Sequence, residues 1–302
     1  MFREFRRQPR IMPELPSGEV EIPSPPYAQE KPDISWFSIL APPAMMMAVS
    51  GLMFMWFRFQ SVFVIASVSM TLMTMLVSIS NAASQIRKFR RKRRERERKY
   101  MQLISDTRGE LRMASEQQRD AMLEMNPDPA ECLRRMARVD PRLWERTASS
   151  PDFLALRLGP GSVPLMLKVK YHRLNVDMDS DPLMMEPQRL AMEFEKVPDS
   201  PVTVHLVKSG VCGVAGPAER TEALLRQLVV QIVTHHGYDD VRLVLVCGDD
   251  GMERWGWLRH VPHLWNDSFR VRHLICGKAM AQPLLGELLA ALRIREDRGY
   301  GG

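Results

Sequence analysis

The chain has 302 residues, of which 45% are hydrophobic and 26% are charged. This balance excludes a mostly disordered chain, and the length allows roughly two domains. The net charge of +6 is unevenly distributed, because the segment 88–99 is dense in Lys and Arg. The four cysteines are widely spaced and include no CxxC pair, which favours reduced thiols in the cytoplasm over a disulfide framework.

A proline-rich segment, residues 1–36, precedes two uncharged runs at 37–57 and 61–80, which are separated by a short connection containing Arg58. Each run is long enough to cross a hydrocarbon core of roughly 30 Å as a helix. We therefore predict a two-helix transmembrane hairpin over residues 37–80. The alternative is a buried helical hairpin inside a large soluble core.

The charges that flank this hairpin predict its orientation. Arg3, Arg6, Arg7 and Arg10 precede the first run, and the basic segment 88–99 follows the second. The positive-inside rule places both flanks in the cytoplasm. The expectation is a multi-pass protein of the cytoplasmic (plasma) membrane with both termini cytoplasmic.

Residues 81–139 are expected to form a helical stalk. The stretch 81–125 contains no proline and a single glycine, and it is rich in good helix formers. The Asn126-Pro-Asp-Pro129 sequence should end this helix, and 130–139 should form a shorter one. We expect the first turns of the stalk to contact anionic lipids. The lipid-facing basic cluster comprises Lys88, Arg90, Arg91, Lys92, Arg93 and Arg94.

A nucleic-acid-binding arm is the alternative interpretation of this basic segment. Such an arm usually carries interleaved aromatic residues or a recognition fold, and the segment offers only Phe89 and Tyr100.

Residues 140–302 are predicted to form an α/β domain that resembles a P-loop ATPase. Apolar runs predict strands at 163–171, 201–207, 240–248 and 270–276, and the stretches 222–233 and 280–292 have helical character. Strands that alternate with helices favour a mainly parallel sheet.

A glycine-rich loop, Gly210–Thr221, lies between the second strand and the helix, which is the context of a nucleotide-binding P-loop. The position after Gly216 should hold Lys and the next Ser or Thr, because the lysine neutralises phosphate charge and the hydroxyl ligates magnesium. The sequence has Pro217 and Ala218 there. We therefore predict a degenerate loop without catalytic residues. Its members are Gly210, Gly213, Gly216, Pro217, Ala218 and Thr221.

Other candidate groups carry weaker signals. Asp249 and Asp250 follow an apolar run and form a degenerate acidic element, which we interpret as turn-forming. His260 and His263 have an H-x-x-H spacing without a clear third ligand, so packing is favoured over a metal site. The pair His235–His236 ends a helix and is expected to interact with its dipole. The sequence predicts no metal site.

Several blocks together resemble one family. Leu143-Trp-Glu-Arg146, Asp152-Phe-Leu154, Leu156-Arg-Leu-Gly159 and Trp255-Gly-Trp-Leu258 are similar to the N-terminal part of the EccC/EssC membrane ATPases. These are FtsK/SpoIIIE-type motors of type VII (ESX) secretion systems. The resemblance implies a first cytoplasmic "DUF" domain with an ATPase-like fold and no working nucleotide motifs.

The resemblance also implies a function: the membrane-anchoring and coupling part of a secretion motor. Its implied partners are other membrane components of the secretion complex, in an oligomer. ATP and Mg²⁺ would be used, and WXG100-type substrates recognised, by downstream domains that lie outside these residues, so this segment needs no cofactor. One alternative is a membrane-anchored DNA-translocating ATPase of the FtsK/SpoIIIE class. Another is a lipid-bound scaffold without a motor.

Overall fold

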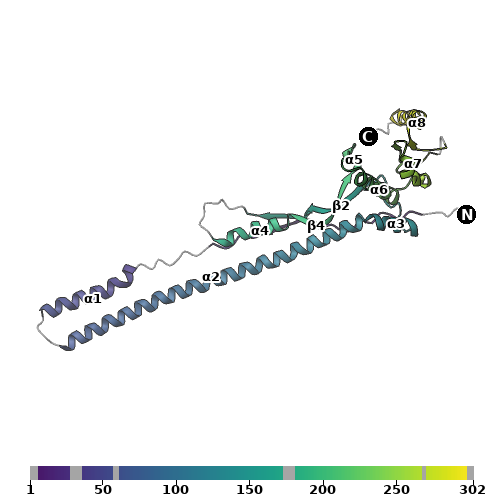
Figure 1. Ribbon diagram of the computed structural model, residues 1–302. Coiled ribbons are helices and arrows are strands. Elements are labelled where there is room, and N and C mark those ends of the chain that lie inside the picture. The colour runs from purple at the N-terminus through teal and green to yellow at the C-terminus, as the bar shows by residue number, and fades with distance from the viewer. Residues whose placement is uncertain (1–5, 28–35, 57–60, 173–180, 267–269, 298–302) are drawn as a thin grey trace. The chain divides into compact units, whose positions relative to one another are not determined.

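The computed structural model describes residues 6–27, 36–56, 61–172, 181–266 and 270–297 (Figure 1). The chain divides into two compact units. Unit 1 contains residues Met1–Pro16, Ser115–Met166 and Lys196–Gly302, and unit 2 contains Ser17–Ala114 and Leu167–Glu195.

The longest element is α2, a single helix over Ser61–Met125 (Figure 1). The predicted helix over 81–125 is confirmed, and it extends further towards the N-terminus than the stalk assigned from sequence. The absence of proline allows this length, because every interior N–H can donate to the carbonyl four residues earlier. The helix ends directly before Asn126-Pro-Asp-Pro129, as predicted.

Unit 2 is built around the part of α2 before residue 115. Tyr100, Ile104 and Leu111 are its buried apolar residues there, and the Tyr100 hydroxyl donates to the Pro23 carbonyl at 3.0 Å. The other elements of unit 2 are β1 (Glu19–Ile22), α1 (Trp36–Trp56), β3 (Lys168–Tyr171), η1 (Pro182–Met185) and α4 (Glu186–Glu193). Strands β1 and β3 pair in parallel.

The prediction of a transmembrane hairpin over 37–80 is wrong. Within the described ranges, none of the helices is both long and apolar enough to cross a membrane. The same finding contradicts the predicted multi-pass membrane localisation. The prediction relied on the absence of charge, which is a weaker criterion than hydropathy, since the two runs also contain prolines, serines and threonines. Arg58, the expected tip residue, lies outside the described residues.

Unit 1 begins with the last turns of α2 and a short helix, α3 (Pro129–Arg138). Asp128 caps α3 by accepting a hydrogen bond from the Glu131 N–H at 2.7 Å, and Pro129 occupies the first turn, where a missing donor costs least. The largest sheet pairs β2 (Ala155–Pro164) with β4 (Lys196–His205) in antiparallel register.

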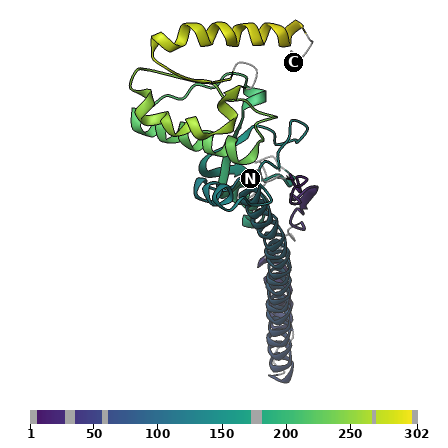
Figure 2. The same cartoon turned by 90° about the vertical axis from the view of Figure 1, so that its right-hand side faces the viewer.

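The remaining elements of unit 1 follow β4. Figure 2 shows them, from α6 in green to α8 in yellow. They are α5 (Leu206–Ser209), α6 (Ala218–His235), β5 (Leu245–Cys247), α7 (Gly251–Trp255), η2 (Gly256–His260), η3 (Pro262–Leu264), β6 (Trp265–Asn266), β7 (Val271–Arg272), β8 (Leu274–Cys276) and α8 (Lys278–Asp297). Two apolar clusters hold this part together, one around Leu156, Ile232 and Val241 and one around Trp255, Leu258 and Leu264.

The predicted mainly parallel α/β sheet is not found. The strands of the described residues form four two-stranded sheets, and in unit 1 only β5 and β8 pair in parallel. The predicted strand at 201–207 belongs to β4, whose partner is the antiparallel β2. The apolar runs therefore overlap β3, β4, β5 and β8, but they missed most of β2 and did not specify strand partners.

Candidate functional site

The glycine-rich loop does not follow a strand directly. The four-residue helix α5 intervenes after β4, and the loop then runs from Gly210 to Pro217 before α6 begins at Ala218. Every residue from Val207 to Arg220 is exposed. The predicted loop residues from Gly210 to Ala218 are thus exposed, and Thr221 is partly buried in α6, but no strand directly precedes the loop to orient a phosphate cradle.

The loop lacks the side chains with which a nucleotide-binding loop holds a phosphate and its magnesium ion. The N–H of Gly210 donates to Leu206 O at 2.9 Å and the N–H of Val211 donates to Ser209 O at 2.7 Å, so two loop donors are used within the turn. Pro217 has no N–H, and Ala218 has no hydroxyl. Glu219 lies in the first turn of α6, where its negative charge opposes an anionic ligand.

The acidic element lies close to the start of α6 through a chain of ion pairs. Asp250 pairs with Arg254 at 2.6 Å, and Arg254 pairs with Glu222 at 3.3 Å. A side chain at Gly277 would overlap the carboxylate of Asp249. Asp250 thus has an ion-pair partner, and Asp249 lies against Gly277 at the exposed end of β5. Neither belongs to a cluster of three or more metal-ligating residues among the described ones.

The basic cluster lies on α2 in unit 2. All of its members are exposed: Lys88, Arg90, Arg91, Lys92, Arg93 and Arg94. Their contact with anionic lipids stays a prediction.

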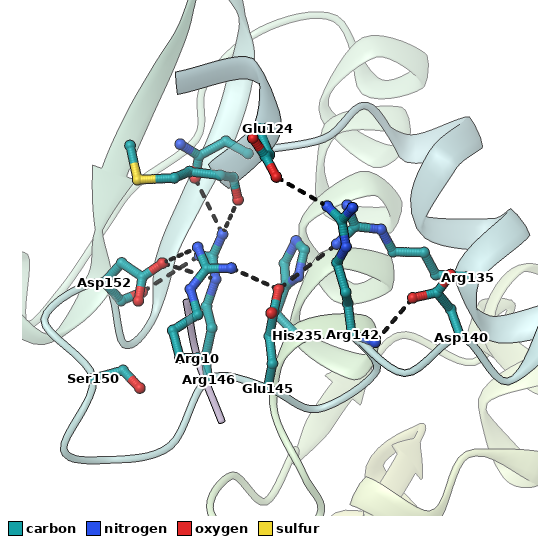
Figure 3. Close-up of polar contacts among 12 residues, drawn as sticks. Arg10, Glu124, Arg135, Asp140, Arg142, Glu145, Arg146, Ser150, Asp152 and His235 are labelled. Carbon is teal, nitrogen blue, oxygen red and sulfur yellow. Dashed lines mark hydrogen bonds and ion pairs between the residues drawn. The ribbon is translucent and has the colours of Figure 1, made fainter. Parts of the chain in front are cut away.

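A buried arginine network in unit 1 is the best-defined polar site of the described residues (Figure 3). Its centre is Arg146, whose side chain is fully buried. The guanidinium donates to the carbonyls of Met125 and Ala155, the latter at 2.7 Å, and pairs with Asp152 at 3.1 Å. Burial lowers the pKa of Arg146 to about 10, and the Asp152 carboxylate opposes this shift. The arginine therefore stays charged at neutral pH and fastens the end of α2 to β2.

A second arginine reaches this network from the N-terminal segment. Arg10 donates to Glu145 and to Asp152, both at 2.6 Å, and only 10% of its side chain is exposed. Arg135 of α3 approaches Glu145 at 3.7 Å. Burial raises the pKa of Glu145, and the neighbouring arginines, Arg10 first, counteract that effect. Glu145 and Asp152 together bridge these cations.

Arg7 forms a similar attachment nearby. It donates to Asp239 at 3.2 Å and to Asp240, and its guanidinium lies against Gly237. Arg7 and Arg10 are therefore engaged in ion pairs, although the sequence analysis counted both as flanking charges. Arg6 is exposed, and Arg3 lies outside the described residues.

The Leu143-Trp-Glu-Arg146 block has a clear structural role. Trp144 adopts a left-handed backbone (φ 61°), and its indole N–H donates to Val233 O at 2.8 Å. The N–H groups of Trp144 and Arg146 donate to the carbonyls of Thr234 and His235, both at 2.9 Å. The block therefore lies along the C-terminal end of α6 and positions Glu145 and Arg146.

His235 and His236 do not act as charged partners of the helix dipole. Both are buried, and burial lowers the pKa of each, that of His236 to about 4. The Leu154 N–H donates to His236 Nε2 at 3.0 Å. The proton of the neutral ring therefore lies on Nδ1, which faces the Ile232 carbonyl at 3.3 Å. Protonating Nε2 would set two donors against each other.

This geometry predicts an acid-sensitive unit 1. Because the folded pKa of His236 lies below the unfolded value of 6.5, the unfolded state binds more protons between these values. The contribution of neutral His236 to the free energy of unfolding is therefore fully present above about pH 6.5. It is lost as the pH decreases towards 4, by about 3 kcal/mol in total. The pKa of Glu145 is raised, so its contribution has the opposite sign: as the pH rises above the usual pKa range of a glutamate, ionisation of Glu145 lowers the free energy of unfolding.

Urea unfolding of the full chain between pH 7 and pH 4 measures this effect. The His236→Gln variant should lose the part of the dependence that comes from His236, whereas His235 and His263, whose pKa values burial also lowers, keep theirs. An NMR titration that placed the pKa of His236 near 6.5 in the folded chain would contradict the argument.

The predicted histidine pair is split by the fold. His263 is buried, and its Nε2 lies 2.8 Å from the His236 carbonyl, whereas His260 is exposed beside Arg259. No group of three or more metal-ligating side chains that could hold an ion was found among the described residues.

Sequence reasoning missed the arginine network almost entirely. It noticed the Leu143–Arg146 block and Asp152 but assigned them no contacts. Glu145 and Arg146 directly follow Leu143-Trp144, and Asp152 directly precedes Phe153-Leu154. Charged residues next to large apolar ones are the signal that could have indicated buried ion pairs.

Comparisons with known proteins agree with the resemblance. The chain is 30% identical over 293 residues to the ESX secretion system protein EccC of Geobacillus thermodenitrificans, covering 96% of this chain and 20% of that protein. It is 24% identical over 296 residues to the ESX secretion system protein YukB of Bacillus subtilis, covering 98% and 20%. It is 23% identical over 295 residues to the type VII secretion system protein EssC of Staphylococcus aureus, covering 97% and 20%. The chain thus spans about a fifth of the length of these curated relatives, and no family model matches it.

Proposed function

We propose that this chain acts in protein secretion as a non-catalytic coupling module. The chain is related over nearly its whole length to type VII secretion proteins of the EccC/EssC family, and it fits an N-terminal segment of them. In this role unit 1 docks on other parts of the secretion machinery. ATP hydrolysis belongs to other domains of such proteins.

The observation that carries this proposal is the contrast between two parts of unit 1. The loop at 210–217 is exposed and lacks the lysine and the hydroxyl that phosphoryl transfer needs. The arginine network is buried and holds the end of α2, the 143–146 block and the N-terminal segment at one place. Buried polar contacts are thus concentrated at the C-terminal end of α2, whereas the nucleotide-like loop is exposed.

A secretion assay tests the proposal. The gene that encodes the chain is replaced by one carrying Arg146→Met, Arg142→Met or Gly213→Ala, and secreted small helical proteins are measured in the medium together with the cellular level of the variant. Secretion should be lost with Arg146→Met and retained with the other two, because Arg142 is half exposed and Gly213 has open space around it. Unchanged secretion with Arg146→Met, or loss with Gly213→Ala at a normal protein level, would overturn the proposal.

Restoring the nucleotide-loop sequence should not restore hydrolysis. The spacing G-x-x-x-x-G-K-[ST] requires Gly at position 211, so the restored variant is Val211→Gly, Pro217→Lys, Ala218→Thr. Val211 is 93% exposed, and its replacement should be tolerated. Because α5 separates the loop from β4, and because β4 pairs with β2 and not with β5, we expect phosphate release no faster than from the unmodified chain.

The matched control is the restored variant with Gly216→Ala added, and phosphate release is followed with ATP and Mg²⁺. Turnover by the restored variant that disappears in this control would show that the loop is a functional nucleotide site and would contradict a purely coupling role.

A further inference from the structure

The cysteines Cys247 and Cys276 lie together in unit 1. Their sulfur atoms are 3.0 Å apart, and both residues are partly exposed. The other two cysteines differ, since Cys132 is buried and Cys212 is exposed in the glycine-rich loop. No CxxC spacing joins any two of the four cysteines in the sequence, so the fold alone brings Cys247 and Cys276 together.

The sheet brings these two residues into register. Cys247 is the last residue of β5 and Cys276 the last of β8, and the two are direct partners in the parallel pairing. Neighbouring strands lie about 4.8 Å apart, and the Cα atoms of a disulfide usually lie about 4.4–6.8 Å apart. The backbone therefore already has the separation that a disulfide needs.

The loops that follow the two strands fix the thiols in place. The Gly277 N–H donates to the Cys247 carbonyl at 3.0 Å, and the Cys247 thiol contacts the Ile275 carbonyl at 3.5 Å. A side chain at Gly251 would overlap the Cys247 sulfur, so glycine is required for this close approach. The sulfurs are thus held next to each other by both strands and by the turn after β5.

We propose that Cys247 and Cys276 form a redox-active dithiol site, which closes to a disulfide by exchange with a low-molecular-weight disulfide such as oxidised glutathione. One protein thiolate attacks the small disulfide, forms a mixed disulfide and releases one small thiolate. The second protein thiolate attacks the protein sulfur of that mixed disulfide and releases the other. The protein loses two electrons and two protons, and the small disulfide is reduced to two thiols.

Closure would fix the ends of β5 and β8, where the turn containing Asp249 and Asp250 begins. Burial raises the pKa of the Cys247 thiol to about 11, with the neighbouring Cys276 as the second cause, so the site reacts slowly at neutral pH. Cys212 differs from this pair of thiols. It is exposed in the loop and has no second cysteine of the described residues beside it, so with the small disulfide it should form a mixed disulfide that does not resolve.

The test uses the reduced full chain and oxidised glutathione at mildly alkaline pH, followed by alkylation of the remaining thiols, trypsin digestion and mass spectrometry. We expect a disulfide that links the peptide 243–254 to the peptide 273–278 as the main intramolecular product. It should persist in Cys212→Ser, be absent in Cys276→Ser, and give way to mixed pairings when the chain is oxidised in denaturant.

Two results would overturn the proposal. One is a folded chain in which Cys247 and Cys276 are both recovered alkylated while Cys212 carries glutathione. The other is a product in which Cys247 and Cys276 carry separate glutathiones without forming a bond to each other.

Discussion

Replacing Arg146 with methionine should destabilise unit 1 by about 3–5 kcal/mol, the range found when one partner of a buried ion pair is removed. Methionine can fill much of the arginine volume, but it leaves Asp152 without this cation and the carbonyls of Met125 and Ala155 without their donor. The two carbonyls are then held away from water without this donor, and Asp152 retains only Arg10 as its cation. Leaving buried groups without their partner costs more than the net value of the bond.

Arg142 provides a matched control four residues away. It pairs with Glu124 at 3.4 Å, with 51% and 56% of the two side chains exposed. A surface pair of this kind contributes about 0–1 kcal/mol, so Arg142→Met should hardly move the urea midpoint. Equal midpoints for Arg146→Met and Arg142→Met would contradict the structural role of the network.

If Arg146→Met does not fold, Arg146→Lys keeps the comparison measurable. Lysine retains the charge, but it lacks the planar fork that serves Asp152 and two carbonyls at once. We expect its urea midpoint to lie below that of Arg142→Met, and a midpoint equal to that of the unmodified chain would refute the argument.

Replacing Arg10 with methionine should destabilise unit 1 by about 2–3 kcal/mol, because Arg10 makes charge-assisted hydrogen bonds to two buried carboxylates. Glu145 is 5% exposed, and with Arg10 removed its nearest cation in the network is Arg135 at 3.7 Å. The loss should also release the N-terminal segment, which becomes sensitive to proteolysis near its attachment.

The neighbouring exposed Arg6 is the control, and Arg6→Met should leave the urea midpoint unchanged. A double-mutant cycle sharpens the test. Arg10→Met with Glu145→Gln should cost less than the sum of the two single variants, because the neutral amide no longer needs the arginine. Strict additivity would mean that the pair does not interact in solution.

Sequence reasoning was accurate where local composition decides the structure. The absence of proline over 81–125 predicted one long helix, and the Asn126-Pro-Asp-Pro129 sequence predicted its end and the start of α3. Helix α6 was also located, because its apolar residues recur at helical spacing. These features depend on residues within a few turns of one another.

The errors concern information that is not local. Strand β4 pairs with β2 and not with the later strands, and the apolar pattern of β4 is compatible with either partner. Arg10 meets Glu145 across a separation of 135 residues, which no spacing rule reveals. The membrane hairpin was predicted from uncharged runs, and the described residues contain no helix that satisfies the stricter criterion of hydropathy.

Copurification tests the central claim most directly. The tagged full chain is isolated from a detergent-treated extract of cells that encode a type VII system, and the recovered proteins are quantified against an Arg146→Met chain. A coupling module should recover other components of that system, and Arg146→Met should reduce their recovery. Recovery of none of them would contradict the claim. Recovery of DNA, with an affinity that falls steeply with salt, would also contradict it and would favour a DNA-translocating role.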